Sequence, residues 1–167
     1  MSPLPAAATH LVVMGVSGAG KTTVGRRLAS DFGLPFFDAD DLHSRANIDK
    51  MRAGVPLSDA DRWPWLEEVG RTMSAHAAGA VTACSALRRT YRDVIREFSP
   101  SARFIHLHAD VGVLQSRIQR RADHFMPASL LWSQLTALEP LQRDELGVTW
   151  GVEKPVDSLI NLVRANI

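Results

Sequence analysis

The residues best suited to chemistry stand together near the start of the chain. Residues 15–22 read GVSGAGKT, which fills the fixed positions of the phosphate-binding pattern G-x-x-x-x-G-K-[ST]. Glycines allow backbone conformations that other residues resist, so successive N–H groups can point at phosphate oxygens. Lys21 is expected to bridge the β- and γ-phosphates, and the Thr22 hydroxyl is expected to bind Mg²⁺. The stretch therefore predicts a nucleoside triphosphate site made by Gly15, Val16, Ser17, Gly18, Ala19, Gly20, Lys21, Thr22 and Thr23.

A pair of carboxylates follows the second apolar stretch. Asp38 and Asp40 are two residues apart, which places both side chains on one side of an extended segment. One carboxylate can take the proton of a substrate hydroxyl that attacks the γ-phosphate, and the other can hold waters around Mg²⁺. A solvated turn or helix cap is the alternative, but a position just after a phosphate loop and a strand favours function. The residues alone do not decide which aspartate is the base.

Basic side chains form two groups. Cations are needed on the equatorial oxygens of a transferring phosphoryl group, and water must be excluded from it. A short mobile segment that carries arginines can do both when it closes. Arg120 also fits a solvated helix face, and His124 fits either a lid contact or a surface position. The first group surrounds the expected acceptor (His43, Arg45, Lys50, Arg88), and the second ends a helix beside a proline-containing break (Arg117, Arg120, Arg121).

This mixture of charges indicates the kind of acceptor. Carboxylates pair with hydroxyl donors, and arginine makes two-pronged contacts with a carboxylate or phosphate. A small molecule that carries both hydroxyls and a negative group, such as a sugar acid, suits such a pocket better than a plain sugar.

The elements that position these residues alternate between strand and helix. Apolar runs predict strands over residues 11–14, 35–38, 80–84, 103–108 and 147–152, with helical patterns between and after them. This alternation predicts an α/β fold with a parallel sheet and right-handed crossovers. Ligands in such sheets collect beyond the carboxyl ends of the strands, where the candidate residues converge. Pro64 suggests that the helix before the third strand begins at residues 61–63.

Composition limits the remaining possibilities. The 167 residues suit one domain over residues 10–167, with residues 1–9 expected to form a flexible tail. The net charge of +1 gives no reason to expect a nucleic-acid partner, and no apolar run has the length of a membrane span. The single cysteine, Cys84, fits a reducing cytoplasm.

Several stretches resemble the gluconate kinase (gluconokinase) family of small P-loop kinases over about residues 10–160. The phosphate loop is shared with many kinases, whereas residues 38–43, 59–66 and 84–89 are far more particular. The matching stretches are MGVSGAGKT at 14–22, FDADDLH at 37–43, NIDKM at 47–51, GVPL at 54–57, DADRWPWL at 59–66, CSALRR at 84–89, YRD at 91–93, HFM at 124–126 and SQLTALEP at 133–140.

The resemblance implies ATP-dependent phosphorylation of D-gluconate to 6-phospho-D-gluconate. It implies a three-layer P-loop NTPase fold similar to shikimate and nucleoside monophosphate kinases. That fold has a five-stranded parallel sheet with helices on both faces, a small lid at about residues 121–140, and often a homodimeric assembly. By position, Asp40 is the base and Asp38 supports Mg²⁺. The resemblance also places Lys21 and Arg121 in catalysis, Arg117 at the nucleotide, and His43, Arg45, Lys50, Arg88 and His124 at gluconate.

One departure and two alternatives stay open. Residues 150–155, WGVEKP, stand where the family usually has an acidic residue, in a loop that borders the adenine. Base preference is therefore less certain than the transfer chemistry. The same fold could phosphorylate shikimate, a nucleoside or another sugar acid. A GTPase-type switch is disfavoured because the chain has no Asn-Lys-x-Asp guanine motif.

Overall fold

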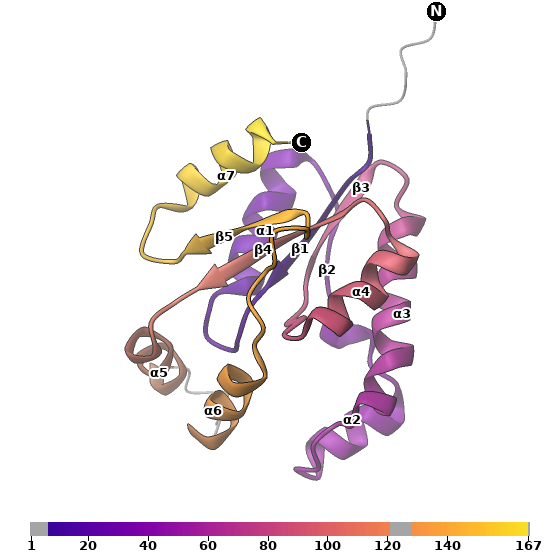
Figure 1. The fold of residues 1–167 in the computed structure, drawn as a ribbon, viewed down its shortest axis with the longest axis vertical. Helices are drawn as coiled ribbons and strands as arrows, with labels where there is room; N and C mark the ends of the chain where they lie inside the picture. Colours follow the sequence, from indigo (N-terminus) through magenta and orange to yellow (C-terminus); the bar gives the residue numbers. More distant parts are fainter. Residues whose placement is uncertain (1–6, 121–127, 167) are drawn as a thin grey trace, which may run out of the picture.

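Five parallel strands form the centre of the protein (Figure 1). The computed structural model describes residues 7–120 and 128–166. The strands stand in the order β2-β3-β1-β4-β5, so the first strand of the chain is central. This confirms the predicted α/β fold with a five-stranded parallel sheet. The strands are β1 (Thr9–Met14), β2 (Phe36–Asp38), β3 (Gly79–Ala83), β4 (Ala102–His108) and β5 (Gly147–Gly151).

Both faces of the sheet are covered by helices, which gives three layers. The alternating side chains of β1 show this directly, because a strand points successive residues to opposite faces. Leu11 and Val13 belong to the core cluster shared with α1, α5, α6 and α7, and Val12 and Met14 to the cluster shared with α3 and α4. The helices are α1 (Lys21–Phe32), α2 (Arg45–Arg52), α3 (Asp59–Ala75), α4 (Arg89–Phe98), α5 (Val111–Arg120), α6 (Ala128–Ala137) and α7 (Val156–Ala165).

The strand sequences explain this burial. A parallel strand covered on both faces needs apolar residues without alternation. β1 and β3 have this character, since five of the six residues of β1 and all five of β3 are buried. In Figure 1, α1 and α7 lie on one side of the sheet and α3 and α4 on the other. Among the described residues, no helix has the length and apolar character needed to cross a bilayer.

The start of α3 differs from the prediction. The helix begins at Asp59 and Pro64 lies inside it, whereas we expected a start at residues 61–63. Ser58 and Asp61 form a capping box: the Asp61 N–H donates to the Ser58 hydroxyl at 3.1 Å, and the Ser58 N–H donates to the Asp61 carboxylate at 2.9 Å. Such caps stabilise a helix start by about 1 kcal/mol. The cap therefore sets the first turn, and the proline is accommodated after it.

Parts of the predicted tail and lid lie outside the described residues. Residues 1–6 are not among the described residues, and β1 begins at Thr9. Residues 121–127 of the predicted lid are also outside the described ranges, whereas α6 falls within them. The division into a tail and a single domain with a lid stays a prediction.

Candidate active site

The phosphate loop connects β1 to α1 and has the backbone shape that its glycines permit. Gly15 has φ 145° and Gly18 has φ 85°, and both values are unfavourable for residues with a side chain. A Cβ atom on Gly15 would also lie 2.9 Å from the Leu107 carbonyl oxygen. Within the described residues, no side chain caps the amino end of α1 and its first turn contains no acidic residue. That helix end is therefore suited to an anion.

Asp38 connects the first turn of α1 to the segment after β2. Its Oδ2 accepts a hydrogen bond from the Thr22 hydroxyl at 3.5 Å, and its Oδ1 accepts one from the Asp40 N–H at 2.9 Å. The neighbouring Lys21 donates from Nζ to the Val16 carbonyl oxygen at 3.1 Å. The predicted metal-binding pair, Thr22 and Asp38, is thus brought together next to the predicted catalytic lysine.

Asp40 does not lie on an extended segment, so our reason for pairing it with Asp38 was wrong. The Asp38 side chain caps a short 3-10 helix, η1 (Ala39–Leu42), and Asp40 is part of that helix. The two carboxylates still influence each other. Desolvation by the surrounding protein and repulsion from Asp38 raise the pKa of the Asp40 carboxyl, while Lys21 opposes the rise. Because 81% of its side-chain surface is exposed, the repulsion is the better-supported cause.

The His43 side chain lies beside Asp40. Its ring stacks on Trp65 with centroids 4.1 Å apart, and only 4% of the side chain is exposed. Burial, and then the charge of Arg62, lowers the pKa of His43, so the ring is neutral at pH 7. Nδ1 lies 3.3 Å from the amide nitrogen of Asn47. In the tautomer that accepts from Asn47, the Nε2–H lies on the side of Asp40, whose Oδ1 is 4.0 Å away.

The other predicted acceptor residues differ in their exposure and in whether they are paired with a carboxylate. Lys50 is paired with Asp61 at 2.8 Å, and Arg45 is 84% exposed and bonded to Asp49 at 3.2 Å. Arg88 is exposed at the amino end of α4. The structure therefore groups Lys21, Asp38, Asp40 and His43, whereas Arg45 and Lys50 are held by carboxylates on α2 and α3.

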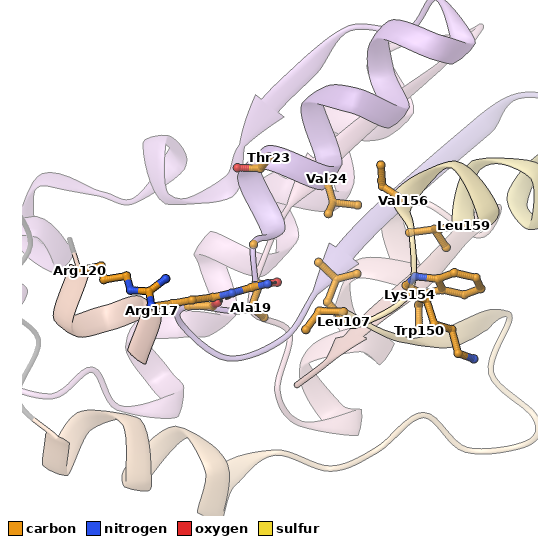
Figure 2. A pocket seen from close by; sticks show the side chains of 13 residues that line it. Ala19, Thr23, Val24, Leu107, Arg117, Arg120, Trp150, Lys154, Val156 and Leu159 are labelled. Atoms are coloured by element: carbon orange, nitrogen blue, oxygen red, sulfur yellow. Dashed lines mark hydrogen bonds between the residues drawn. The ribbon is translucent and has the colours of Figure 1, made fainter. Parts of the chain in front are cut away.

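A cavity of about 370 Å³ opens beside the phosphate loop. Figure 2 shows Arg117 and Arg120 at one end, and Trp150 with Lys154 at the other. The Lys154 Nζ stands 5.0 Å from the centre of the Trp150 ring. Arg117 donates to the carbonyl oxygens of Gly18 and Ala19, both at 3.3 Å, so it already contacts the loop that it was predicted to serve. The cavity is lined by arginines where it meets the loop, and by the Trp150 ring with the Lys154 ammonium at its far end.

Arg120, which the sequence left open as a solvated residue, lines this cavity. Thr23 lines it as well, as expected for a nucleotide-binding residue. Arg121 and His124 lie outside the described residues.

Two site residues had no role in the sequence interpretation. Gln134 on α6 bonds to Ser17 in the phosphate loop, and Arg92 on α4 is buried beneath the loop that carries Arg88. Both lie in stretches that carry the family resemblance, at 133–140 and 91–93. That resemblance was the available signal, because their contacts join residues far apart in the chain.

A phosphate loop after a central strand, with a carboxylate at the end of β2, the next strand along the chain, defines the class of small P-loop kinases. The family model described as shikimate kinase matches residues 17–134. The chain is also 45% identical to a thermosensitive gluconokinase of Escherichia coli K12, covering 83% of this chain and 76% of the relative. It is 47% identical to a gluconokinase of Gluconobacter oxydans, covering 92% and 89%. The chain belongs to the gluconokinase family.

A solved structure agrees with this assignment. The crystal structure of a gluconokinase from Sinorhizobium meliloti superimposes with a TM-score of 0.83 at 43% identity, over 94% of this chain and 90% of that one.

Proposed function

We propose that this protein transfers the γ-phosphoryl group of ATP to the terminal hydroxyl of D-gluconate. The observation that carries the proposal is the hydrogen bonding of Asp38 to both the Thr22 hydroxyl and the Asp40 N–H, which holds Asp40 beside the phosphate loop, in a chain 45–47% identical to gluconokinases. The products are 6-phospho-D-gluconate and ADP.

The nucleotide half of the reaction uses the loop and the neighbouring cavity. The triphosphate lies along the loop N–H groups and the amino end of α1, where the helix dipole favours negative charge. The adenine occupies the end of the cavity near Trp150, and Arg117 lies where the phosphates meet the loop. Lys21 neutralises charge that develops on the transferring group. We place Arg121 in the same role and His124 at the acceptor; both assignments rest on the family resemblance.

Asp40 supplies the base for the acceptor. The hydroxyl oxygen forms a bond to the γ-phosphorus while the bond from that phosphorus to the β,γ-bridging oxygen breaks. The hydroxyl proton passes to the Asp40 carboxylate, and ADP retains the bridging oxygen. Its exposure to solvent leaves this carboxylate accessible to an incoming acceptor.

Arg88 is the best candidate for binding the gluconate carboxylate. Among the described residues it has no carboxylate partner, whereas Arg45 and Lys50 each have one. The Arg45–Asp49 pair is exposed, and such a pair contributes about 0–1 kcal/mol, so exchanging Asp49 for a substrate oxygen costs little. Arg45 can therefore join His43 around the acceptor when it binds, and Lys50 can join them if the acceptor replaces the partly buried Asp61.

The chemistry of Thr22 and Asp38 fits a magnesium ion. Mg²⁺ prefers oxygen ligands, keeps several waters and is commonly held by one or two protein groups together with phosphates. The Thr22 hydroxyl and an Asp38 carboxylate oxygen are 3.5 Å apart at the start of α1. When bound, the ion offsets negative charge on the phosphate oxygens. Asp38 therefore serves a different purpose from Asp40.

An acceptor comparison tests the proposal. ADP release is measured with a coupled assay using ATP and Mg²⁺, with D-gluconate, shikimate, a nucleoside and an epimeric sugar acid as separate acceptors. We expect turnover with D-gluconate, and mass spectrometry should show one added phosphoryl group. Turnover with shikimate but not with gluconate would reject the assignment. GTP replaces ATP in a parallel series, and a preference for GTP without acceptor-stimulated turnover would support a switch instead.

We also propose a homodimer that works in the cytoplasm, without a nucleic-acid or membrane partner. The family resemblance supports the dimer, and the single cysteine and near-neutral charge support the rest. Light scattering at several protein concentrations tests the assembly, and a monomer throughout would reject it.

A further inference from the structure

Gln134 on α6 is bonded to the phosphate loop at two points. Its side-chain oxygen accepts from the Ser17 N–H at 2.7 Å, and its side-chain nitrogen donates to the Ser17 hydroxyl at 3.1 Å. These residues are 117 positions apart, and both are half-buried. The amide orientation is set by its partner, because the Ser17 N–H requires an acceptor. One glutamine thus satisfies both the N–H and the hydroxyl of one loop residue.

A second side chain holds the next part of the loop from α5. Arg117 binds the carbonyl oxygens of Gly18 and Ala19, the two residues that follow Ser17. Gln134 therefore binds the N–H group of Ser17, and Arg117 binds the carbonyl groups of the two residues that follow. Of the loop N–H groups from Gly18 onward, that of Ala19 donates to the Val16 carbonyl oxygen at 3.2 Å. The others can turn toward a phosphate, since the neighbouring peptide groups are fixed by side chains.

The same stretch of chain also reaches the acceptor side. Glu139 donates its N–H to the Leu87 carbonyl oxygen at 2.7 Å, and its carboxylate accepts from the Arg89 N–H at 3.0 Å. Leu87 and Arg89 flank Arg88. Residues 134–139 therefore contact the phosphate loop at one end and the loop that carries Arg88 at the other.

We infer that Gln134 is a positioning residue for phosphoryl transfer, which holds Ser17 so that the phosphate loop keeps its nucleotide-binding shape. The inference rests on the proposed ATP site. Gln134 acts through Ser17, and Glu139 extends the same support toward the acceptor side. Losing the glutamine should loosen the loop and weaken nucleotide binding before it affects the acceptor.

The test replaces Gln134 with methionine, which has a similar length and lacks both amide groups. We expect kcat/KM for ATP to fall about tenfold or more, because a hydrogen-bonded pair in a site contributes about 1–2 kcal/mol. The KM for D-gluconate should stay within about threefold. Thr136→Ala is the matched control, since Thr136 is exposed on the same helix and, among the described residues, its hydroxyl donates only to the Trp132 carbonyl oxygen of that helix. A fall in thermal midpoint with an unchanged KM for ATP would overturn the inference, because it would show a purely structural role.

A double-mutant cycle isolates the contact. Ser17→Ala removes the hydroxyl and keeps the N–H bond, so its effect on ATP binding should be smaller than that of Gln134→Met. When the two are combined, the loss should be less than the sum of the single losses, because they share one interaction. If the two losses in ATP binding simply add, the contact between Gln134 and Ser17 is not the cause of the weaker binding.

Binding of a fluorescent ATP analogue without acceptor keeps this result separate from the proposed acceptor. If the wild-type chain binds the analogue but does not phosphorylate gluconate, the function proposal fails while Gln134 can still be judged. An analogue affinity that is the same in Gln134→Met and Thr136→Ala overturns the inference.

Discussion

Arg92 and Glu145 form an ion pair in which neither side chain has any solvent exposure, with the Arg92 Nε 2.7 Å from the Glu145 Oε1. The same guanidinium donates to the carbonyl oxygens of Ala86 and Leu87, at 2.9 and 3.3 Å. Ala86 has φ 45°, the one positive value among the described residues other than glycine. Arg92 therefore stabilises the strained turn that leads to Arg88, and the ion pair with Glu145 holds the Arg92 side chain in place.

Removing one member of this pair should destabilise the fold severely. Arg92→Met leaves the Glu145 carboxylate buried without its main partner, and breaking such a pair typically costs about 3–5 kcal/mol. We expect a loss of that size in the free energy of unfolding, measured with urea. The double variant Arg92→Met/Glu145→Met should recover much of it, because the Glu145 charge is removed together with that of Arg92 and Arg96 keeps Asp93 as a partner. Two losses that simply add would argue against the pair as the source.

Acid should weaken the same region. Burial alone would raise the pKa of Glu145, but hydrogen bonds from Arg92 and from the Gln142 N–H overcome it and lower the pKa to about 2. A carboxyl with a lowered pKa contributes stability that is present above its unfolded value and is lost as the pH falls. The free energy of unfolding should therefore decline between about pH 4.5 and pH 2, and it should decline less steeply in Glu145→Gln. Equal slopes for the two proteins would contradict this account.

Lys21→Ala should remove most of the turnover and leave the fold intact. The side chain donates to the Val16 carbonyl oxygen and is half-buried, so its loss leaves no large cavity in the core. The transition state loses a positive charge, and losses of about a hundredfold or more in kcat are typical for such groups. Steady-state kinetics measure the loss, with circular dichroism as the check on folding. A rate close to wild type would count against the phosphate-loop assignment.

Substitutions of the two aspartates should separate their roles. Asp40→Asn removes the proposed base, so kcat should fall by about a hundredfold or more while ATP affinity changes little. Asp38→Asn weakens the partner of Thr22 and the cap of η1, so its main effect should be on the Mg²⁺ concentration needed for half-maximal rate. A magnesium titration of both variants measures this difference. A larger kcat loss in Asp38→Asn would mean that the roles are reversed.

The sequence predicted what depends on local pattern. Continuous apolar runs predicted the bounds of the strands to within one or two residues. The glycines and lysine of the phosphate loop indicated the nucleotide-binding turn. The alternation of strands and helices along the chain was enough to predict a parallel sheet. These features depend on residues close together in the chain.

What the sequence missed depends on distant contacts or on a competing local signal. Gln134 and Ser17 are 117 positions apart, and Arg92 and Glu145 are 53 apart, so no periodic pattern connects them. The Asp38 cap turned the next residues into η1, which the strand alternation did not anticipate. Likewise, the Ser58 and Asp61 capping box extended α3 past the start suggested by Pro64.

The charge environment of Asp40 gives a last prediction, which can be measured first without the acceptor and then in the rate with gluconate. Its pKa is raised by desolvation and by Asp38 and held back by Lys21, so the basic form should be lost at a higher pH than for an ordinary aspartate. Titration of the Asp40 carboxyl carbon by NMR measures this directly. Asp38→Asn removes the repulsion and should lower the pKa, whereas Lys21→Met removes the attraction and should raise it. The acid limb of kcat/KM for gluconate should move to lower pH in Asp38→Asn, because a lower pKa keeps the base ionised in stronger acid. If the NMR pKa moved the same way in both variants, Asp38 and Lys21 would not act on Asp40 with opposite sign.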